Sequence, residues 1–356
     1  MEQLIDQAVA VRAGEELDAT AVDAFIKRHA SGLDGAPEIT QFPGGASNLT
    51  YLVRYANRDL ILRRPPFGHR AKSAHDMARE ARIMAALKPV YRYVPDVVAF
   101  CEDQSVMGCD FYVMDRIKGI IPRQNLPKGL ALNEEDTRKL CLNVIDKMIE
   151  LHQVDYKQAG LDHLGKGEGY VARQIDGWSE RFRQARTEDV GDFEAVMAWL
   201  KAKQPAKDVA TCLIHNDYRF DNVVLNPDNP FEVIGVLDWE MATLGDPLMD
   251  LGNTLAYWVQ ADDDPIFQQM RRQPTNAPGM LTRQEVIDYY GEKTGYHVDN
   301  FDFYAIYGLF RLAVIVQQIY RRYQEGQAKN PQFAMFGGIA NYLEQRCQRL
   351  ISQSTL

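Results

Sequence analysis

The chain has 356 residues, of which 40 are Lys or Arg and 49 are Asp or Glu, for a formal net charge of −9. This length is sufficient for two lobes around a shared cleft, and 46% hydrophobic with 25% charged residues is typical of a globular protein. Proteins that bind nucleic acids usually concentrate Lys and Arg on one face. An acidic balance spread along the chain therefore argues against DNA or RNA as a partner.

The distribution of cysteine and of apolar residues predicts a soluble, cytoplasmic protein with no membrane partner. The five cysteines are far apart and form no C-x-x-C pair, which fits neither a disulfide framework nor a zinc site. The first residues lack the basic and apolar regions of a secretory signal. The most apolar stretch, Ile306 to Ile319, contains Arg311 and is shorter than the roughly 20 residues of a membrane span.

The first part of the chain predicts a small, mainly β lobe. Helical spacing of apolar residues predicts an opening helix from Thr20 to Ala30. A second helix is expected from Ser73, as its N-cap, to Leu87. Short runs rich in β-branched and aromatic residues predict five strands, at Glu38–Phe42, Thr50–Tyr55, Leu60–Arg63, Val97–Cys101 and Asp110–Met114.

Long helical patterns dominate after Gly119. The change of pattern near Arg116 to Ile121 predicts a nucleotide-binding lobe over residues 1–118 and a catalytic, substrate-binding lobe over residues 119–356. A β-rich segment, Cys212 to Leu237, interrupts the helices. The helices are predicted at Asn133–Leu151, Val171–Ala185, Phe193–Lys203, Arg283–Thr294 and Phe303–Gln324.

The strongest chemical signal is a polar loop between two apolar runs. It reads His215-Asn216-Asp217, has Asn222 five residues after the Asp, and is followed by an apolar run that ends at Asp238. Phosphoryl transfer needs a carboxylate that accepts a hydroxyl proton, and carboxylate and amide oxygens that hold Mg²⁺ on the phosphates. The spacing H-x-D-x-x-x-x-N with a later Asp is the arrangement found in protein kinases. We therefore predict Asp217 as the catalytic base, and Asn222 and Asp238 as metal ligands.

These motifs resemble those of the aminoglycoside phosphotransferase and choline kinase-like family. The segment Leu244–Leu251 is similar to the family signature G-D-P-x-x-D-L, and Phe42–Tyr51 is similar to its nucleotide-binding loop. The resemblance extends over nearly the whole chain. It is closest to the kinase-like domain fused to some acyl-CoA dehydrogenases, in which runs like Leu62–Pro66 and Asp238-Trp239-Glu240 also occur.

The resemblance implies a two-lobed, protein-kinase-like α+β fold with a nucleotide in the cleft. ATP is the expected donor, GTP is the alternative, and the connector from Asp115 to Ile117 is expected to offer backbone groups to the purine. His215, Asp246 and Asp250 are expected to support the catalytic loop. His152, near a predicted helix end, is expected to be a packing residue.

The glycine-containing loop of Gly44, Gly45, Ser47 and Asn48 is predicted to cover the phosphates. Glycines let backbone N–H groups approach a nucleotide closely, although two glycines between strands are also typical of a simple hairpin turn. The resemblance to a catalytic loop downstream favours the phosphate-binding interpretation.

A kinase-like fold also requires a cation on the third strand, paired with a Glu on the following helix. The candidates are Arg63 and Glu80. Adjacent strand residues point to opposite faces, so either Arg63 or Arg64 could face inward. Glu80 could equally be a solvated helix residue.

The sequence predicts a Mg²⁺-dependent phosphotransferase acting on a hydroxyl of a small molecule. The resemblance to the dehydrogenase-fused branch implies a hydroxyacyl-CoA acceptor, whose phosphates require cations. Arg271, Arg272, Arg321 and Arg322 are candidates or simply surface residues, and at most one of the last two is expected to point inward beside Asp217. An aminoglycoside phosphotransferase, whose cationic acceptor would favour an acidic pocket, and a non-catalytic nucleotide-binding protein are the alternatives. The oligomeric state stays open.

Overall fold

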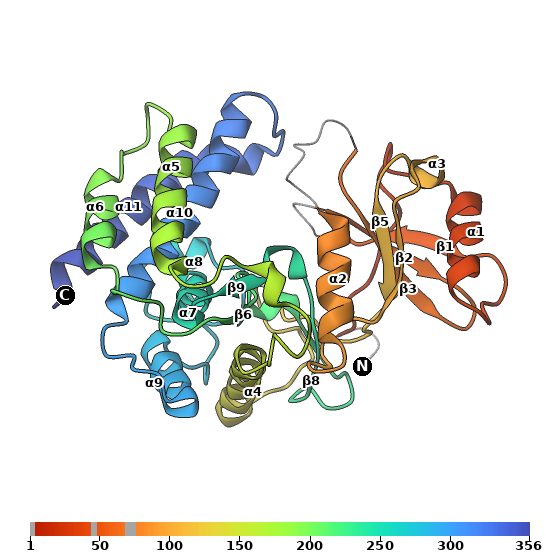
Figure 1. The fold of residues 1–356 in the computed structure, drawn as a ribbon, viewed down its shortest axis with the longest axis horizontal. Helices are drawn as coiled ribbons and strands as arrows, with labels where there is room; N and C mark the ends of the chain where they lie inside the picture. The colour runs from red at the N-terminus through yellow and green to blue at the C-terminus, as the bar shows by residue number, and fades with distance from the viewer. Residues whose placement is uncertain (1–3, 44–47, 68–75) are drawn as a thin grey trace.

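The computed structural model describes residues 4–43, 48–67 and 76–356. These residues form a small lobe built on one sheet and a larger, mostly helical lobe (Figure 1). This arrangement confirms the predicted two-lobed α+β fold. Gly44, Gly45, Ser47 and Ser73, which the sequence analysis singled out, lie outside the described residues.

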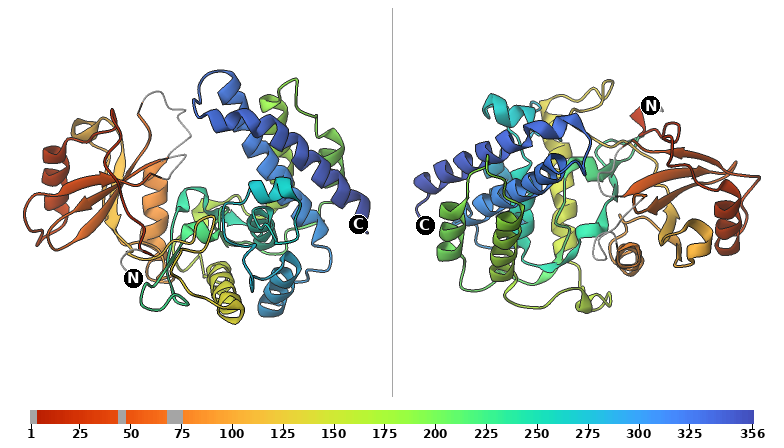
Figure 2. Two further views of the ribbon diagram at one scale, coloured as in Figure 1. Left: turned by 180° about the vertical axis from the view of Figure 1, so that it is seen from behind. Right: turned by 90° about the horizontal axis from the view of Figure 1, so that it is seen from above.

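The small lobe contains a five-stranded antiparallel sheet in the order β1-β2-β3-β5-β4. Helix α1 (Ala19–His29) covers the face away from the larger lobe, and α2 (Met77–Leu87) covers the opposite face (Figures 1 and 2). A short helix, α3 (Gln104–Met107), precedes the last strand. The strands are β1 (Glu38–Gln41), β2 (Leu49–Arg54), β3 (Asp59–Arg64), β4 (Val97–Cys101) and β5 (Phe111–Asp115).

Side chains along the strands point alternately to the two faces of the sheet, so the small lobe has one apolar layer on each face. On β3, Leu60 and Leu62 belong to the cluster that includes α1, whereas Ile61 belongs to the cluster that includes α2. Successive strand residues point to opposite faces, so Arg63 shares the α2 side with Ile61. Both faces of the sheet are therefore covered by helices.

Helix α2 begins later than predicted. Its N-cap is Asp76, three residues after the expected one, and the Asp76 side chain accepts a hydrogen bond from the Arg79 N–H. An Asp at this position satisfies a backbone donor that the first turn leaves without a partner. The shift places Glu80 in the first turn, buried against the sheet.

The larger lobe is organised around α10, whose residues are mostly buried and which packs against α5, α7 and α11. A Cβ on Gly308 of α10 would collide with the carbonyl oxygen of Gly252 on α7, so the small residue permits this close approach. The helices are α4 (Glu134–His152), α5 (Tyr170–Ala185), α6 (Glu194–Lys203), α7 (Pro247–Ala256), α8 (Pro265–Gln269), α9 (Arg283–Thr294), α10 (Asp302–Gln324) and α11 (Phe336–Gln353).

Among the described residues, α10 is the one helix long and apolar enough to cross a membrane by length and composition. However, 78% of its most apolar 18-residue window is buried within the protein. A helix buried in this way is the core helix of its lobe.

Two short hairpins position the polar loop of the larger lobe. Strand β6 (Cys212–Ile214) pairs with β9 (Thr243–Gly245), and β7 (Val223–Leu225) pairs with β8 (Val233–Val236). A bridge between Ile120 and Leu225 attaches the connector between the lobes to β7. The loop after β6 and the segment after β8 therefore lie next to the cleft.

Candidate active site

A buried carboxylate, Asp250 on α7, anchors the polar loop that follows β6. Its Oδ2 accepts hydrogen bonds from the His215 N–H at 2.9 Å and lies 2.9 Å from His152 Nε2. Its Oδ1 accepts from the Asn216 N–H at 2.8 Å. Burial alone would raise the pKa of Asp250, but the hydrogen bonds and charge interactions with His152 and His215 together outweigh burial and lower it. His152, expected to be a packing residue, is therefore part of this anchor.

His215 lies inside the loop as a structural support. Its side chain is fully buried, with Nε2 2.9 Å from the Leu237 carbonyl oxygen and Nδ1 3.2 Å from the Asp217 backbone nitrogen. The ring also contacts Trp239, with 4.9 Å between ring centroids. Both ring nitrogens are thus occupied by the backbone of the two segments that carry Asp217 and Asp238.

The carboxylate of Asp217 is held by Arg219, two residues later in the loop. Arg219 Nη1 lies 2.9 Å from Asp217 Oδ1, and its Nε donates to Asp221 at 2.8 Å. The guanidinium also lies over the ring of Tyr257 at 4.7 Å. Burial raises the pKa of Asp217, and the positive charge of Arg219 opposes that rise. Arg219 was not among the residues predicted from sequence, although an Arg two residues after the predicted base was a visible signal.

Asn222 and Asp238 are adjacent although they lie on separate segments. The Leu237 N–H donates to the Asn222 carbonyl oxygen at 2.8 Å, which places Asp238 directly beside Asn222. Asn222 Nδ2 donates to the Asp217 carbonyl at 2.8 Å and to Asp217 Oδ2 at 3.2 Å. The backbone of Asp238 has φ 67°, a left-handed conformation that costs energy in a residue with a side chain. This conformation directs the segment after β8 into the cleft.

The chemistry of this pair fits Mg²⁺. Asn222 uses its amide nitrogen toward Asp217, so its amide oxygen remains available together with the Asp238 carboxylate. Mg²⁺ prefers such oxygen ligands and usually completes its coordination with substrate phosphates and water. Among the described residues, no cluster of three or more His, Cys, Asp or Glu side chains could hold a metal ion alone.

Arg63, and not Arg64, faces the cleft. Arg63 Nη1 lies 2.7 Å from Glu80 Oε1, and Arg63 Nη2 lies 3.5 Å from Asp238 Oδ1. Burial would lower the pKa of Arg63, but Glu80 together with further acidic neighbours, among them Asp238, outweighs burial and raises it. Arg64 instead lies over the ring of Phe67 at 3.6 Å. Glu80 is therefore a buried ion-pair partner, since it is only 1% exposed.

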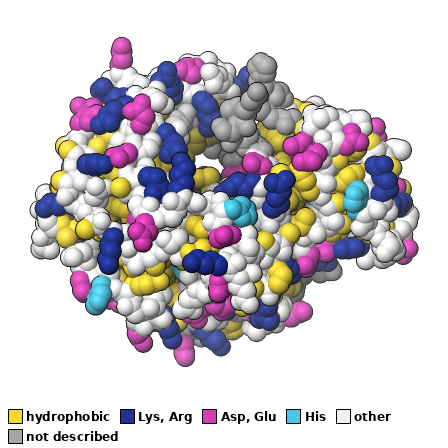
Figure 3. Space-filling view, viewed as in Figure 1, with side chains coloured by type: hydrophobic (Ala, Val, Ile, Leu, Met, Phe, Trp, Pro, Cys, Tyr) yellow, Lys and Arg dark blue, Asp and Glu magenta, His cyan; other side chains and the backbone are white. Residues whose placement is uncertain are grey.

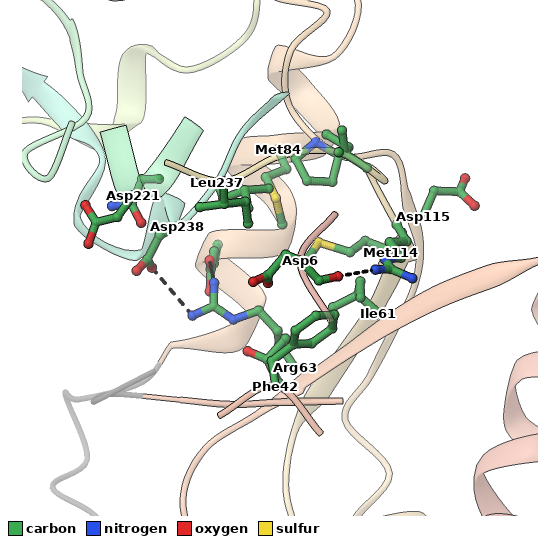
Figure 4. A pocket seen from close by; sticks show the side chains of 18 of the residues that line it. Asp6, Phe42, Ile61, Arg63, Met84, Met114, Asp115, Asp221, Leu237 and Asp238 are labelled. Carbon is green, nitrogen blue, oxygen red and sulfur yellow. Dashed lines mark hydrogen bonds and ion pairs between the residues drawn. The ribbon is translucent and has the colours of Figure 1, made fainter. Parts of the chain in front are cut away.

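A cavity of about 180 Å³ opens between the lobes, beside these residues. Its polar end carries Arg63, Asn222 and Asp238, and its other end is lined by the connector from Asp115 to Ile117 (Figure 4). Apolar side chains from both lobes form the walls between these ends. They include Ile61, Met84, Met114, Ile121 and Leu237.

The side chain of Asp115 does not point into this cavity. Figure 4 shows it directed away, and Arg58 pairs with both of its oxygens at 2.8 and 2.9 Å. A ligand at this end would therefore meet the backbone of the connector.

Side chains of the small lobe contact the segment after Asp238. Asn48 Nδ2 donates to Glu240 Oε2 at 2.9 Å. Arg79 on α2 donates to the carbonyl oxygens of Glu240, at 3.1 Å, and of Ala242. Together with Arg63, these contacts join the two lobes at the polar end of the cavity.

Besides Arg219, an arginine of helix α10 contacts the loop that carries Asp217. Arg311 on α10 is 4% exposed, and its Nη2 donates to the Asn216 carbonyl oxygen at 2.9 Å. Its guanidinium lies 5.2 Å from the Trp178 ring, and Arg181 lies 4.7 Å from the same ring. Two cations thus flank Trp178 near the loop.

Of the two candidates expected beside Asp217, Arg321 is bound elsewhere. Arg321 follows Arg311 by ten residues on α10, which corresponds to about 15 Å along the helix axis. It pairs with Glu325 at 2.8 Å and donates to the Gln184 carbonyl oxygen. The cation that reaches the loop from α10 is therefore Arg311, which the sequence analysis noted only as an interruption of an apolar stretch.

Asp246 anchors the start of α7. Its Oδ1 accepts from the N–H groups of Leu248 and Met249 at 2.8 and 3.1 Å, and its Oδ2 accepts from the Val209 N–H at 2.6 Å. Burial raises the pKa of Asp246 to about 6, although these donors oppose the rise. The segment leading into β6 is thereby attached to the helix that carries Asp250.

A two-lobed fold with this catalytic loop and cleft defines a kinase-like phosphotransferase. The family model described as "Phosphotransferase enzyme family" matches residues 38–285, and the chain belongs to this family.

The chain is also similar to parts of larger proteins. Acyl-CoA dehydrogenase family member 10 of Mus musculus is 37% identical over 298 residues, which are 83% of this chain and 27% of that protein. Acyl-CoA dehydrogenase family member 11 of Homo sapiens is 29% identical over 334 residues, which are 92% of this chain and 42% of that protein. The chain thus spans less than half the length of these relatives.

Solved structures share the fold. A Ralstonia eutropha protein assigned as an aminoglycoside phosphotransferase has a TM-score of 0.79 at 29% identity, covering 96% of this chain and 100% of that chain. Choline kinase from Cryptosporidium parvum has a TM-score of 0.64 at 13% identity, and the match covers 94% of this chain and 97% of the choline kinase. An aminoglycoside phosphotransferase in a ternary complex with AMP-PNP and hygromycin B has a TM-score of 0.57 at 15% identity. The match covers 95% of this chain and 99% of that chain.

Proposed function

We propose that the chain is a cytoplasmic, Mg²⁺-dependent phosphotransferase that moves the γ-phosphate of ATP to a hydroxyl group of a small molecule. The observation that carries this proposal is that Asn222, Asp238 and Arg63 share one end of the cavity, with Asp217 bonded to Asn222 behind them. GTP is the alternative donor. The solved relative that holds AMP-PNP supports the use of a nucleotide.

In the proposed reaction, Asp217 accepts the proton of the attacking hydroxyl. Arg219 fixes the orientation of this carboxylate through Oδ1, and Asn222 does so through Oδ2. Asn222 and Asp238 would hold Mg²⁺, which neutralises phosphate charge during transfer. Arg63, fixed by Glu80, adds a positive charge to the phosphate end of the cavity.

For the acceptor, we propose a hydroxyacyl-CoA. Two observations support it: the similarity to acyl-CoA dehydrogenase family members, and the cations Arg219, Arg311 and Arg181 near the catalytic loop. Figure 3 shows Lys and Arg side chains on both sides of the hollow between the lobes. A cationic surrounding favours the phosphates of CoA and disfavours a polycationic aminoglycoside.

The test is a panel of hydroxyl acceptors assayed for phosphate transfer from Mg-ATP. Hydroxyacyl-CoA thioesters, choline and kanamycin-type aminoglycosides form the panel, and the Asp217→Asn variant is the matched control for contaminating kinases. Transfer to the thioesters that the variant lacks is expected. Efficient transfer to the aminoglycosides and none to the thioesters would contradict the proposed hydroxyacyl-CoA acceptor. The proposed phosphotransferase reaction would still stand.

A non-catalytic nucleotide-binding protein is the remaining alternative. It would bind Mg-ATP without transferring phosphate to any acceptor and without hydrolysing ATP faster than the Asp217→Asn variant. The complete set of Asp217, Asn222 and Asp238 argues against this alternative.

A further inference from the structure

The N-terminal segment before α1 runs along the rim of the cavity between the lobes. At one end, Val9 and Gln41 exchange two backbone hydrogen bonds of 2.8 Å. At the other end, the Asp6 N–H donates to the Gly119 carbonyl oxygen at 3.2 Å, and Arg116 Nη2 donates to the Asp6 carbonyl oxygen at 2.6 Å. The segment is thus fastened both to the sheet of the small lobe and to the connector, which fixes the position of Asp6.

The carboxylate of Asp6 lines the cavity. Figure 4 shows it between Arg63 and Asp238 on one side and Met114 and Ile61 on the other. Its side chain is 23% exposed, and Arg123 Nη2 contacts Oδ1 at 2.8 Å. Within residues 4–43, 48–67 and 76–356, no hydrogen bond to the other oxygen, Oδ2, is formed.

The position of this carboxylate corresponds to the sugar of a bound nucleotide. A purine at the connector and phosphates near Arg63 and Asp238 would place the ribose between them, where Asp6 lies. An ionised carboxylate is a hydrogen-bond acceptor only, and the 2′- and 3′-hydroxyls of ribose are donors. Acidic side chains recognise ribose hydroxyls in the same way in dinucleotide-binding folds. The positive charge of Arg123 limits repulsion between Asp6 and the nearby phosphates.

We propose that Asp6 is a specificity-determining residue that accepts a hydrogen bond from a ribose hydroxyl of the nucleotide. The N-terminal segment is then part of the nucleotide site and not only a packing element of the small lobe. This inference rests on the proposed function, because it requires the cavity to hold a nucleotide.

The test compares nucleotides that differ by one hydroxyl. Dissociation constants for ATP, 2′-deoxy-ATP and 3′-deoxy-ATP are measured by calorimetry with Mg²⁺ on the full chain and on its Asp6→Ala variant. The parent chain is expected to bind ATP about 10-fold more tightly than at least one deoxy analogue, the range of a hydrogen bond to a charged group. In Asp6→Ala, the affinity for ATP is expected to fall to that of the analogue, whose own affinity changes little.

The Arg123→Met variant is the matched control, because it removes the ion pair but keeps the carboxylate. It is expected to retain the discrimination between ATP and the deoxy analogue. An Asp6→Ala variant that binds ATP and both analogues more weakly by one common factor would show that Asp6 only anchors the segment, and would overturn the proposal.

Two further outcomes separate this inference from the proposed function. If Asp6→Ala alters the preference between ATP and GTP but not the discrimination against deoxy analogues, Asp6 contacts the base and the ribose assignment is wrong. A parent chain that binds ATP and both analogues equally also overturns the inference alone, whereas one that binds no nucleotide overturns both.

Discussion

Replacing Asp250 by Asn tests whether a single buried carboxylate holds the catalytic loop in place. Asp250 is fully buried, and both of its oxygens accept hydrogen bonds, from the backbone of His215 and Asn216 and from His152. An amide has only one oxygen. In the Asp250→Asn variant, at least one buried backbone N–H would face an NH₂ group instead of an acceptor.

The expected loss of stability follows from this count. A buried donor without a partner costs about 1–3 kcal/mol, and loss of the negative charge also weakens the remaining bonds. We expect the free energy of unfolding to fall by about 3 kcal/mol, measured by urea denaturation at pH 7. Turnover should fall as well, because Asp217 directly follows the released Asn216 in the loop.

Asp246→Asn is the matched control, since it is the same change one turn earlier on α7. Its amide oxygen can still accept from the Leu248 and Met249 N–H groups at the helix start. The Val209 N–H loses its acceptor, but Val209 is 37% exposed, so water can replace that acceptor. A loss below about 1 kcal/mol is expected at pH 7. If Asp250→Asn lost no more stability than this control and kept its turnover, the anchoring role of Asp250 would be refuted.

Three further predictions concern catalysis, the metal and pH. Asp217→Ala should reduce phosphate transfer by roughly 10²-fold to 10⁴-fold while nucleotide binding persists; near-normal turnover would exclude Asp217 as the base. Asn222→Ala and Asp238→Ala should each weaken binding of Mg-ATP in calorimetry, and unchanged affinity in both would contradict the metal assignment. The raised pKa of Asp246, about 6 against 3.8, means that its neutral form stabilises the fold below about pH 3.8, and that this contribution is lost as the pH rises through about 6. Urea denaturation from pH 4 to pH 7 should therefore show the parent losing on the order of 3 kcal/mol relative to Asp246→Asn, and parallel curves for the two proteins would contradict this.

The order of strands and helices in the small lobe was predictable from sequence, but the direction of one side chain was not. The run Leu60-Ile61-Leu62 is apolar throughout because helices cover both faces of the sheet. Without alternation between apolar and polar residues, the sequence does not show which face either Arg63 or Arg64 occupies. That Arg63 and not Arg64 faces the cleft follows only from the position of α2, which packs on the face that carries Ile61.

In the larger lobe, the catalytic motifs were visible but their supports were not. Every residue of helix α7 is buried, but its sequence was matched only to the family signature, and no helix was predicted there. Asp246-Pro247, an N-cap followed by Pro at the first helical position, was a usable signal for its start. His152 meets Asp250 across 98 residues of sequence, and such a contact depends on the tertiary fold.

The contacts of Asn48, Arg63 and Arg79 with residues 238–242 have a kinetic consequence. All three side chains belong to the small lobe, and all reach one short segment of the larger lobe. The lobes can move apart at this end of the cleft only when these contacts separate, and in many enzymes such opening limits the overall rate. An Arg79→Met variant, which loses two of these bonds, is therefore expected to release nucleotide faster in stopped-flow measurements while its affinity for nucleotide falls.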